Sequence, residues 1–398
     1  MNGVLKVTKD KINKSALSLL TIDTLTSILG LFLDTFLVAY FYNITNQNLK
    51  VISIFHMITY TVTGMCFWLL GDIVKTKNPV NVCRTGIVLH CLYILAIALL
   101  KEQIQYYYPI FAIFYGLLLG VYWSGYHVVM SETFFSLNTK RFVSLQNISS
   151  QLVKILAPII LGTSIQLSSF SNVAIAVFII ALLQFIASFF MKKIEPKNTS
   201  FNLLKYIHHV KNSFKLKNFY RAMVLNGVVK MVLSTIITLM IIMTFKTSLN
   251  LGILTSIFSG FSILSLYIFN RFYRAKNPQK IIVFSAIILS SSVIILVIGI
   301  SKPAVIIYNL INSIFMVLLN VIATIQRYDC MDETTSEEFV AEHQAFTEIN
   351  LAIGRLLGYS TLLLVSLFEN ILYLKILLLL ITICIVLYAK GLYRVQKK

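Results

Sequence analysis

The chain divides at Met191-Lys192-Lys193-Ile194-Glu195-Pro196-Lys197, the start of a basic segment that continues to Arg221. The other basic residues of this segment are Lys205, Lys211, Lys215 and Lys217. Apolar runs long enough to cross a bilayer fill most of the chain before and after it. Lys and Arg collect in loops that stay on the cytoplasmic side of a membrane. The sequence therefore predicts two membrane halves, 1–192 and 219–398, joined by a cytoplasmic linker, 193–218.

The composition excludes a soluble domain. Hydrophobic residues make up 58% of the chain and charged residues only 12%, whereas a soluble domain carries about a quarter charged residues. The net charge of +19 is also typical of nucleic-acid binding. Here, however, the basic residues cluster between apolar runs, where they orient a chain in an anionic membrane. We expect an integral membrane protein with no nucleic-acid partner.

The apolar runs give the number of spans, because about twenty residues at 1.5 Å each cross the roughly 30 Å of hydrocarbon. The predicted spans are 16–42, 50–74, 79–100, 107–131, 142–167, 171–191, 219–245, 250–273, 279–300, 303–326, 339–367 and 371–390. The expected fold is all-α, with twelve transmembrane helices in two six-helix bundles. The linker adds an apolar stripe at helical spacing, Leu203, Ile207, Val210 and Phe214, which predicts a helix lying flat on the membrane.

The loop charges support this topology. If both termini are cytoplasmic, the outside loops hold only Lys50, Lys101, Lys246 and Lys302. The remaining basic residues then fall in cytoplasmic segments or near the ends of spans, except Lys154, Lys230 and Arg355, which lie within spans 5, 7 and 11. One cytoplasmic loop, 329–342, is acidic, but acidic residues contribute little to orientation.

A weak internal repeat accompanies the two halves. Lys77-Asn78-Pro79 and Lys276-Asn277-Pro278 are 199 positions apart and lie at the same place in each half. Parallel half-repeats with a central cytoplasmic linker are the plan of major facilitator transporters. The chain resembles that superfamily over essentially its whole length.

The resemblance also implies gating residues. Leu70-Gly71-Asp72 and Lys77 fit the superfamily signature between spans 2 and 3, whereas Trp68, Ile73 and Lys75 depart from it. The resemblance implies that Asp72 belongs to a gate between the halves; a plain acid at a helix end is the alternative. Glu132 and Arg141 match the cytoplasmic gating network weakly.

A second signature of the superfamily concerns the direction of transport. The stretch Ala157-Pro158-Ile159-Ile160-Leu161-Gly162 keeps the Pro and one Gly of the span 5 signature of efflux antiporters. Small residues there would let span 5 press against a neighbouring helix. The resemblance favours export, although a Pro in a transmembrane helix is common in any case.

Charged residues at membrane depth cost several kcal/mol and are rarely kept without a role. Asp34, Glu348 and Asp23 are our candidates for proton or ion coupling. Asp23 and Asp34 are eleven residues apart in span 1 and so share a helix face. Asp34 lies deeper and can couple a proton or pair with a buried Lys, whereas Asp23 is better explained as structural.

Polar residues on spans 4, 5, 7, 10 and 11 are expected to line a substrate cavity. These candidates are Trp123, Tyr126, His127, Asn147, Gln151, Lys154, Asn226, Lys230, Asn312, Asn350 and Arg355. Gly116, Gly120 and Ser124 are expected to pack against another helix, and His127 can equally be a hydrogen-bonded core residue. The deep charges either form ion pairs that break during transport or pair permanently and make burial tolerable.

No nucleotide-binding or hydrolase motif is present, and the five cysteines have no metal-binding spacing, with Cys330 expected in a loop. We expect no enzyme activity and no cofactor. The sequence predicts a secondary active transporter of a small organic solute that works by alternating access. Proton-coupled export of an amphipathic compound is favoured, and an uptake symporter is the alternative. A non-transporting sensor or scaffold, docking through loop 329–342, is the third possibility.

The expected location is the plasma membrane. The expected partners are a small-molecule substrate, membrane lipids and protons or another coupling ion, and the expected state is a monomer.

Overall fold

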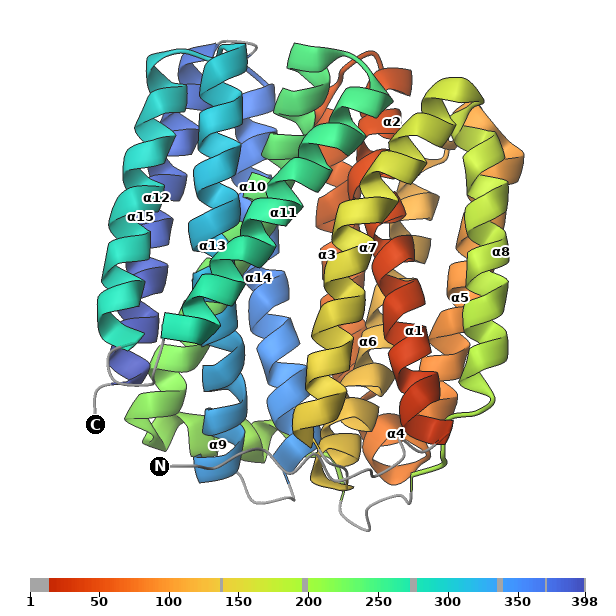
Figure 1. Ribbon diagram of the computed structural model, residues 1–398. Coiled ribbons are helices and arrows are strands. Elements are labelled where there is room, and N and C mark those ends of the chain that lie inside the picture. The colour runs from red at the N-terminus through yellow and green to blue at the C-terminus, as the bar shows by residue number, and fades with distance from the viewer. Residues whose placement is uncertain are drawn as a thin grey trace.

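The computed structural model describes residues 14–136, 139–194, 200–272, 278–334, 339–368 and 371–396, and all regular structure in these ranges is helical. Twelve helical segments of the described chain are long and apolar enough to cross a membrane. This confirms the predicted number of spans. The two six-helix bundles stand side by side, the red-to-yellow half beside the green-to-blue half (Figure 1).

The first half contains the spans expected between residues 16 and 191. Its elements are α1 (Lys14–Leu31), the π-helix η1 (Phe32–Phe36), α2 (Leu37–Ile44), α3 (Leu49–Leu69), α4 (Gly71–Thr76), α5 (Pro79–Leu100), the 3-10 helix η2 (Lys101–Gln105), α6 (Tyr108–Ser136), α7 (Thr139–Leu167) and α8 (Phe170–Ser188). The first span runs through α1, η1 and α2 without a break.

The second half follows the linker helix. These elements are α9 (Leu203–Asn212) in the linker, then α10 (Phe214–Phe245), α11 (Ser248–Phe272), α12 (Pro278–Ile298), α13 (Lys302–Thr334), α14 (Val340–Ser366) and α15 (Ile371–Val395). One expectation was wrong: Cys330 lies in α13 and is buried rather than in a loop. The membrane-spanning part of α13 ends at Arg327, but polar residues sustain helical hydrogen bonds in water, so a helix need not end where its apolar run ends.

The repeated Lys-Asn-Pro tract marks the start of the third span in each half. Asn78 caps α5, because its side-chain oxygen accepts a hydrogen bond from the backbone N–H of Val80 at 3.0 Å. Pro79 then occupies the first helical turn, where a missing N–H costs no hydrogen bond. Pro278 begins α12 at the corresponding position.

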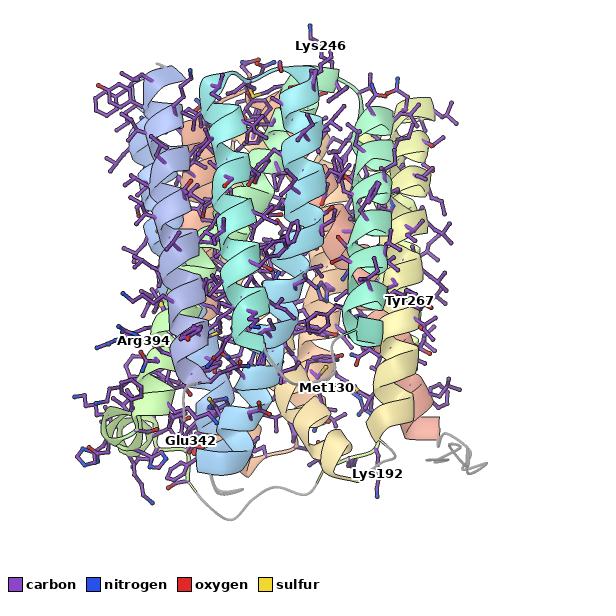
Figure 2. The ribbon with its side chains drawn as sticks, turned by 60° about the vertical axis from the view of Figure 1, so that its left-hand side comes forward. Met130, Lys192, Lys246, Tyr267, Glu342 and Arg394 are labelled. Atoms are coloured by element: carbon purple, nitrogen blue, oxygen red, sulfur yellow. The ribbon has the colours of Figure 1, made fainter. Side chains whose placement is uncertain are left out.

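The two ends of the helix bundle can be told apart by the linker helix, which lies at only one of them. Figure 2 places Lys192 and Glu342 at one end and Lys246 at the other. The helix α9 lies across the first of these ends, where α1 begins (Figure 1). We call it the linker end and the opposite one the far end.

The linker forms a helix, but this helix ends at Asn212, and Phe214 of the expected stripe begins α10 and is exposed. Tyr206 connects the linker helix to the second half. The Tyr206 hydroxyl lies 2.8 Å from Nδ1 of His343 and 2.7 Å from the Tyr220 hydroxyl. Burial raises the pKa of Tyr206, so the phenol remains neutral. Val210 is buried as well, whereas Leu204 is exposed. The helix therefore has a docked face and a free face.

Glycines allow the closest helix crossings. The Gly116 and Gly120 positions pack on α3, where a Cβ at residue 116 would lie 2.7 Å from Val62 Cβ. This confirms the packing role expected for that face of span 4. Between the halves, Gly162 of α7 meets Gly252 of α11. The small face expected on span 5 thus presses against span 8.

Candidate functional site

A cavity of about 500 Å³ lies between the two halves. Span 1 contributes Asp34 and Thr35, and span 2 contributes His56 and Tyr60. The second half provides most of the polar wall: Lys230, Ser234 and Thr238 of α10; Ser259 and Ser262 of α11; Asn309, Asn312 and Asn320 of α13; and Tyr359 of α14. Asp34 and Lys230 lie deep in the bundle, yet their side chains are exposed because they face this cavity.

Two acids of span 1, Asp23 in α1 and Asp34 in η1, receive matching hydrogen bonds from α6. Tyr115 donates to Asp34 Oδ1 at 2.7 Å, and Tyr126 donates to Asp23 Oδ1 at 2.6 Å. The two tyrosines are eleven residues apart, as the two acids are. Antiparallel helices bring such equal spacings into register. The predicted shared face of Asp23 and Asp34 is therefore the face of span 1 that lies toward α6.

Each of these acids has a basic residue nearby. The positive charges of Arg355 and Lys230, both in the second half, act on Asp34. The charge of Lys154, on α7 of the first half, acts on Asp23. Asp34 is thus the acid that faces positive charge across the cavity. The negative charge of Asp23 is offset by a positive charge within its own half, that of Lys154.

The backbone at Asp34 is unusual. Asp34 lies in the middle of η1, the five-residue π-helical turn that interrupts span 1. Such π-bulges are rare and occur frequently at functional sites. The wider turn changes the direction of the side chains that follow it, and Thr35 beside Asp34 also lines the cavity.

An ion pair closes the linker end below this cavity. Lys75 Nζ lies 2.7 Å from Glu342 Oε1, and the two side chains are 3% and 0% exposed. The pair joins α4 of the first half to α14 of the second. Linker residues cover it: Asn202 N–H donates to Glu342 Oε1 at 3.0 Å, and Lys75 donates to the Ser200 carbonyl at 3.3 Å.

A second contact between the halves lies deeper. His127 Nε2 of α6 is 3.4 Å from Glu348 Oε1 of α14. Arg327 of α13 donates to the same carboxylate oxygen at 3.0 Å and also hydrogen-bonds Gln344. Glu348 therefore accepts from both halves at once.

The two halves also contact each other toward the far end. The α2 segment of span 1 packs on α10. On one side of the cavity, the rings of His56 and Tyr359 stack with centroids 4.6 Å apart. The Arg355 guanidinium lies over the ring of Tyr60, 4.8 Å from its centroid. Contacts between the halves thus occur toward both ends of the cavity.

The predicted cavity residues divide into two groups. Lys230 and Asn312 line the cavity, and Arg355 adjoins it through Tyr60. Trp123, Tyr126 and His127 lie nearer the linker end and form an aromatic cluster, with Trp123 and His127 stacked at 5.3 Å. They are not among the residues that line this cavity.

The remaining candidates are placed as follows. Asn350 is buried and donates to the Phe346 carbonyl at 2.7 Å, a hydrogen bond within its own helix. Asn226 is buried, and Gln151 is half-buried on α7. The side chains of Asn147, Glu132 and Arg141 lie outside the described part of the structure.

Asp72 contacts the linker. It is exposed, and its Oδ1 accepts from the Phe201 N–H at 3.3 Å. The buried ion pair between the halves is made by Lys75, three residues later. In the sequence, Lys75 stands out only as a departure from the superfamily signature. The sequence predicts that Glu342 ends an acidic loop, whereas Glu342 is fully buried in α14.

Several site residues were missed from the sequence. Tyr115 had a detectable signal, because its spacing from Tyr126 repeats that of Asp23 and Asp34. His56 and Tyr359 are not distinguished by the sequence, since a lone histidine or tyrosine in an apolar span is commonly a core residue. Their role at the cavity depends on how spans 2 and 11 cross.

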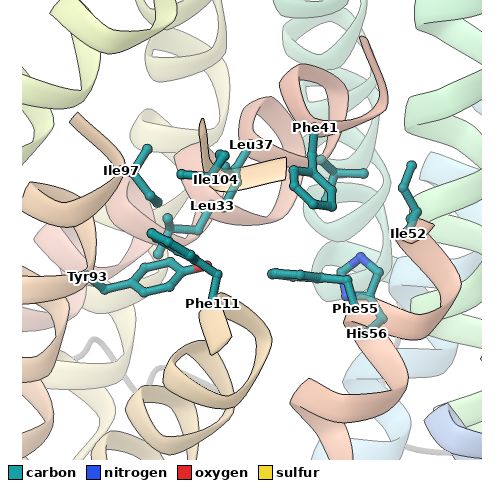
Figure 3. Close-up of a pocket in the computed structure, with 11 residues that line it drawn as sticks. Leu33, Leu37, Phe41, Ile52, Phe55, His56, Tyr93, Ile97, Ile104 and Phe111 are labelled. Atoms are coloured by element: carbon teal, nitrogen blue, oxygen red, sulfur yellow. The ribbon is translucent and has the colours of Figure 1, made fainter. Parts of the chain in front are cut away.

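A small apolar pocket of about 20 Å³ adjoins the cavity inside the first half. In Figure 3 the rings of Tyr93 and Phe111 lie on one side of this pocket, and Phe55 and His56 lie on the other. His56 lines both spaces. Neither of its ring nitrogens has a hydrogen-bond partner among the described residues.

The twelve spans in two six-helix bundles have the fold of the major facilitator transporters, a class of multi-pass membrane proteins. A solved bacterial homologue of the iron transporter ferroportin, in an inward-facing state, aligns with a TM-score of 0.69 and 14% identity, over 98% of this chain and all of that one. The nucleoside transporter NupG aligns at 0.70 with 12% identity, over 97% of this chain and 100% of its own. These identities establish the fold alone.

One curated sequence is also similar. The uncharacterized protein YqgE of Bacillus subtilis (strain 168) is 22% identical over 371 residues, which is 92% of this chain and 86% of YqgE. No family model matches the sequence.

Proposed function

We propose that the protein is a secondary active transporter that exports a small organic solute in exchange for protons, by alternating access to the central cavity. One observation carries this proposal. Asp34 of the first half lies in the cavity wall under the influence of two basic residues of the second half, Lys230 and Arg355. A carboxyl in that position responds both to a proton and to a charged solute.

The coupling follows from this charge arrangement. Ionised Asp34 attracts Lys230 and Arg355 and favours closure of the halves around the cavity. Protonation of Asp34 removes that attraction and frees the two cations to hold a solute or to move away. A ligand shifts a conformational equilibrium only through its different affinity for the two states, and both proton and solute have that property here.

The linker-end contacts fit a gate. Lys75–Glu342 and His127–Glu348 join the halves, so both contacts must break for the cavity to open at this end. A buried ion pair that is broken leaves two uncompensated charges, which costs several kcal/mol unless water or other groups replace the partner. Opening would solvate both charges, so the cost is met by hydration.

We assign the linker end to the cytoplasm of a plasma membrane, because the basic linker lies there and basic loops remain cytoplasmic. The partners are then the solute, protons and membrane lipids. Nothing in the mechanism requires more than one copy of the chain.

Export is favoured over uptake by the α7–α11 crossing. Pro158 and Gly162 of α7 pack against Gly252 of α11, which is the contact that the efflux resemblance implies for this stretch. An uptake symporter is the second candidate, since the same cavity and the same acid would serve it. The scaffold hypothesis loses part of its docking surface, because Glu342 is buried in an ion pair.

The test is solute flux into liposomes that contain the purified protein, with and without an imposed pH gradient, across a solute panel. We expect at least one solute to accumulate only with the gradient. Asp34→Asn should reduce that flux to the level of protein-free liposomes, because an amide cannot take up and release a proton. Inverted and right-side-out membrane vesicles then distinguish export from uptake.

Two controls make the flux result specific. Asp329→Asn makes the same change at an exposed site beyond the span of α13 and should transport normally. Asp23→Asn removes the other acid of span 1, which does not line the cavity, and should retain most of the flux. If no solute responds to the gradient, or if Asp34→Asn responds fully, proton coupling through Asp34 is refuted.

A further inference from the structure

The wall that the second half contributes to the central cavity is unusually rich in hydroxyl groups. Ser259 and Ser262 of α11 face Ser313 of α13, and α10 adds Ser234 and Thr238. The three asparagines of α13 lie beside them. Apolar residues line the rest of the cavity: Leu233, Ile237, Ile241, Phe258, Met316 and Val317.

Most of these hydroxyl protons are already used. Ser262 donates to the Ser313 carbonyl at 2.8 Å, Ser259 donates to Thr255 at 2.8 Å, and Ser313 donates to Leu310 at 2.8 Å. A hydroxyl has one proton and two lone pairs. Once the proton is committed to a backbone carbonyl, the group can only accept further hydrogen bonds. This wall therefore presents acceptors.

Two amides on α13 add to the acceptors. The side-chain oxygens of Asn312 and Asn320 are buried and have no hydrogen-bond partner among the described residues. A buried acceptor without a partner is unfavourable, and a ligand that donates a hydrogen bond would relieve that cost. Both residues line the cavity. The wall therefore matches a solute that carries hydroxyl or amino donors.

The charge in the cavity is positive. Lys230 makes no hydrogen bond or ion pair within the described residues, although it feels the charges of Asp34 and Glu348 at longer range. Arg355 lies over Tyr60, and its Nε is buried without a partner in the described chain. Glu348 already has Arg327 and His127. Lys230 and Arg355 therefore both act on Asp34, whose carboxylate accepts a hydrogen bond from Tyr115.

We propose that the solute is a small hydrophilic organic anion that carries several hydroxyl or amino groups. Its carboxylate or phosphate binds Lys230 and Arg355, and its donors bind Asn312, Asn320 and the hydroxyl wall. A cavity of about 500 Å³ lies in the usual range for small organic ligands. This inference rests on the proposed transport function and names the chemistry of the same site.

The experiment is ligand-induced thermal stabilisation of the purified full-length protein in detergent, which needs no pH gradient. The probes are sugar acids, hydroxy acids and amino acids, the corresponding sugar phosphates, neutral sugars, fatty acids of equal chain length without hydroxyls, and the lipophilic cation tetraphenylphosphonium. We expect only anions with several donors to raise the melting temperature. The sugar acids and sugar phosphates separate a carboxylate from a phosphate.

Variants connect the stabilisation to the cavity. Lys230→Met should weaken binding of the stabilising anion by about tenfold or more, the usual size for a lost charge-assisted hydrogen bond. Lys230→Arg should retain most of the binding. Asn312→Leu should weaken binding of the hydroxylated anion more than it weakens binding of the analogue that lacks hydroxyls. Lys217→Met, at an exposed position of the same helix α10, should bind normally.

The proposal is overturned if tetraphenylphosphonium or a neutral sugar stabilises best, if no probe stabilises, or if Lys230→Met binds the anion normally. Should Lys230→Met fail to fold, Lys230→Arg and Asn312→Leu still decide the outcome. Failure of proton coupling gives a different result, since binding in detergent would then persist while flux in liposomes ignores the gradient.

Discussion

Single residues of the two halves pair their charges across the contact between the bundles. Lys75 and Glu342 are 267 positions apart in the chain and form a fully buried pair. Burying two charges is costly, and their attraction repays that cost only when both partners are present. Such a pair is better suited to a switch than to stability, because losing either partner is expensive.

A charge-swap experiment tests this pair. Lys75→Glu or Glu342→Lys alone should destabilise the closed linker end by about 3–5 kcal/mol, because each places like charges together in a buried site. The double variant restores opposite charges and should recover much of the loss. The measurement is the melting temperature in detergent, together with alkylation of a cysteine introduced at Ser200, which covers the pair.

A double variant that melts no higher than the worse single variant would show that the pair does not act as a unit. Lys77→Glu, an exposed position on the same segment, serves as the matched control. It should change the melting temperature little, since exposed charges contribute within about 1 kcal/mol.

At the scale of helices, glycine positions decide where two backbones can touch. Gly227 of α10 and Gly354 of α14 lie in one such crossing within the second half, and a Cβ at residue 354 would overlap the Val224 carbonyl. Gly162 and Gly252 form the crossing between the halves. Neither crossing can accept a side chain unless a helix moves.

Gly354→Ala should therefore destabilise the protein by about 1–3 kcal/mol, the usual cost of overpacking a tight site. Gly260→Ala, within α11, meets nothing within 4 Å. It should be neutral or stabilise by up to about 1 kcal/mol, because Ala favours a helix more than Gly does. Melting temperatures of the two variants provide the comparison, and equal values would show that the α10–α14 crossing is not tight.

At the scale of the whole molecule, two bundles must move relative to each other if access alternates. Spans 2 and 11 contact each other across the halves, and a Cβ at Gly64 would lie 3.2 Å from Ala352 Cβ. That separation is slightly shorter than the roughly 3.5–4.5 Å between Cβ atoms in disulfides. A small adjustment would allow a covalent bond between the halves.

A cross-link at this point tests the motion. In a background without the five native cysteines, the pair Gly64→Cys and Ala352→Cys should form a disulfide on oxidation and lose flux. A reducing agent should restore the flux, and each single variant should be insensitive to oxidation. Full flux through the oxidised pair would exclude a rocking motion at the contact between spans 2 and 11.

The spans and the two-half architecture were predictable because they depend on local composition. An apolar run of about twenty residues crosses a bilayer wherever it occurs, and loop charges orient it. The shared face of Asp23 and Asp34 was predictable too, since helix periodicity is local. Cys330 was misplaced because the apolar run ends before the helix does.

The partners of the charged residues required the fold. Composition shows that Asp34, Lys230 and Arg355 lie at membrane depth, but the crossing of two bundles brings an acid of one half opposite cations of the other. The sequence does not indicate that Lys75 pairs with Glu342, since a contact across 267 positions depends on how every intervening helix packs. Membrane insertion is set segment by segment, whereas an ion pair depends on the distance between two particular atoms.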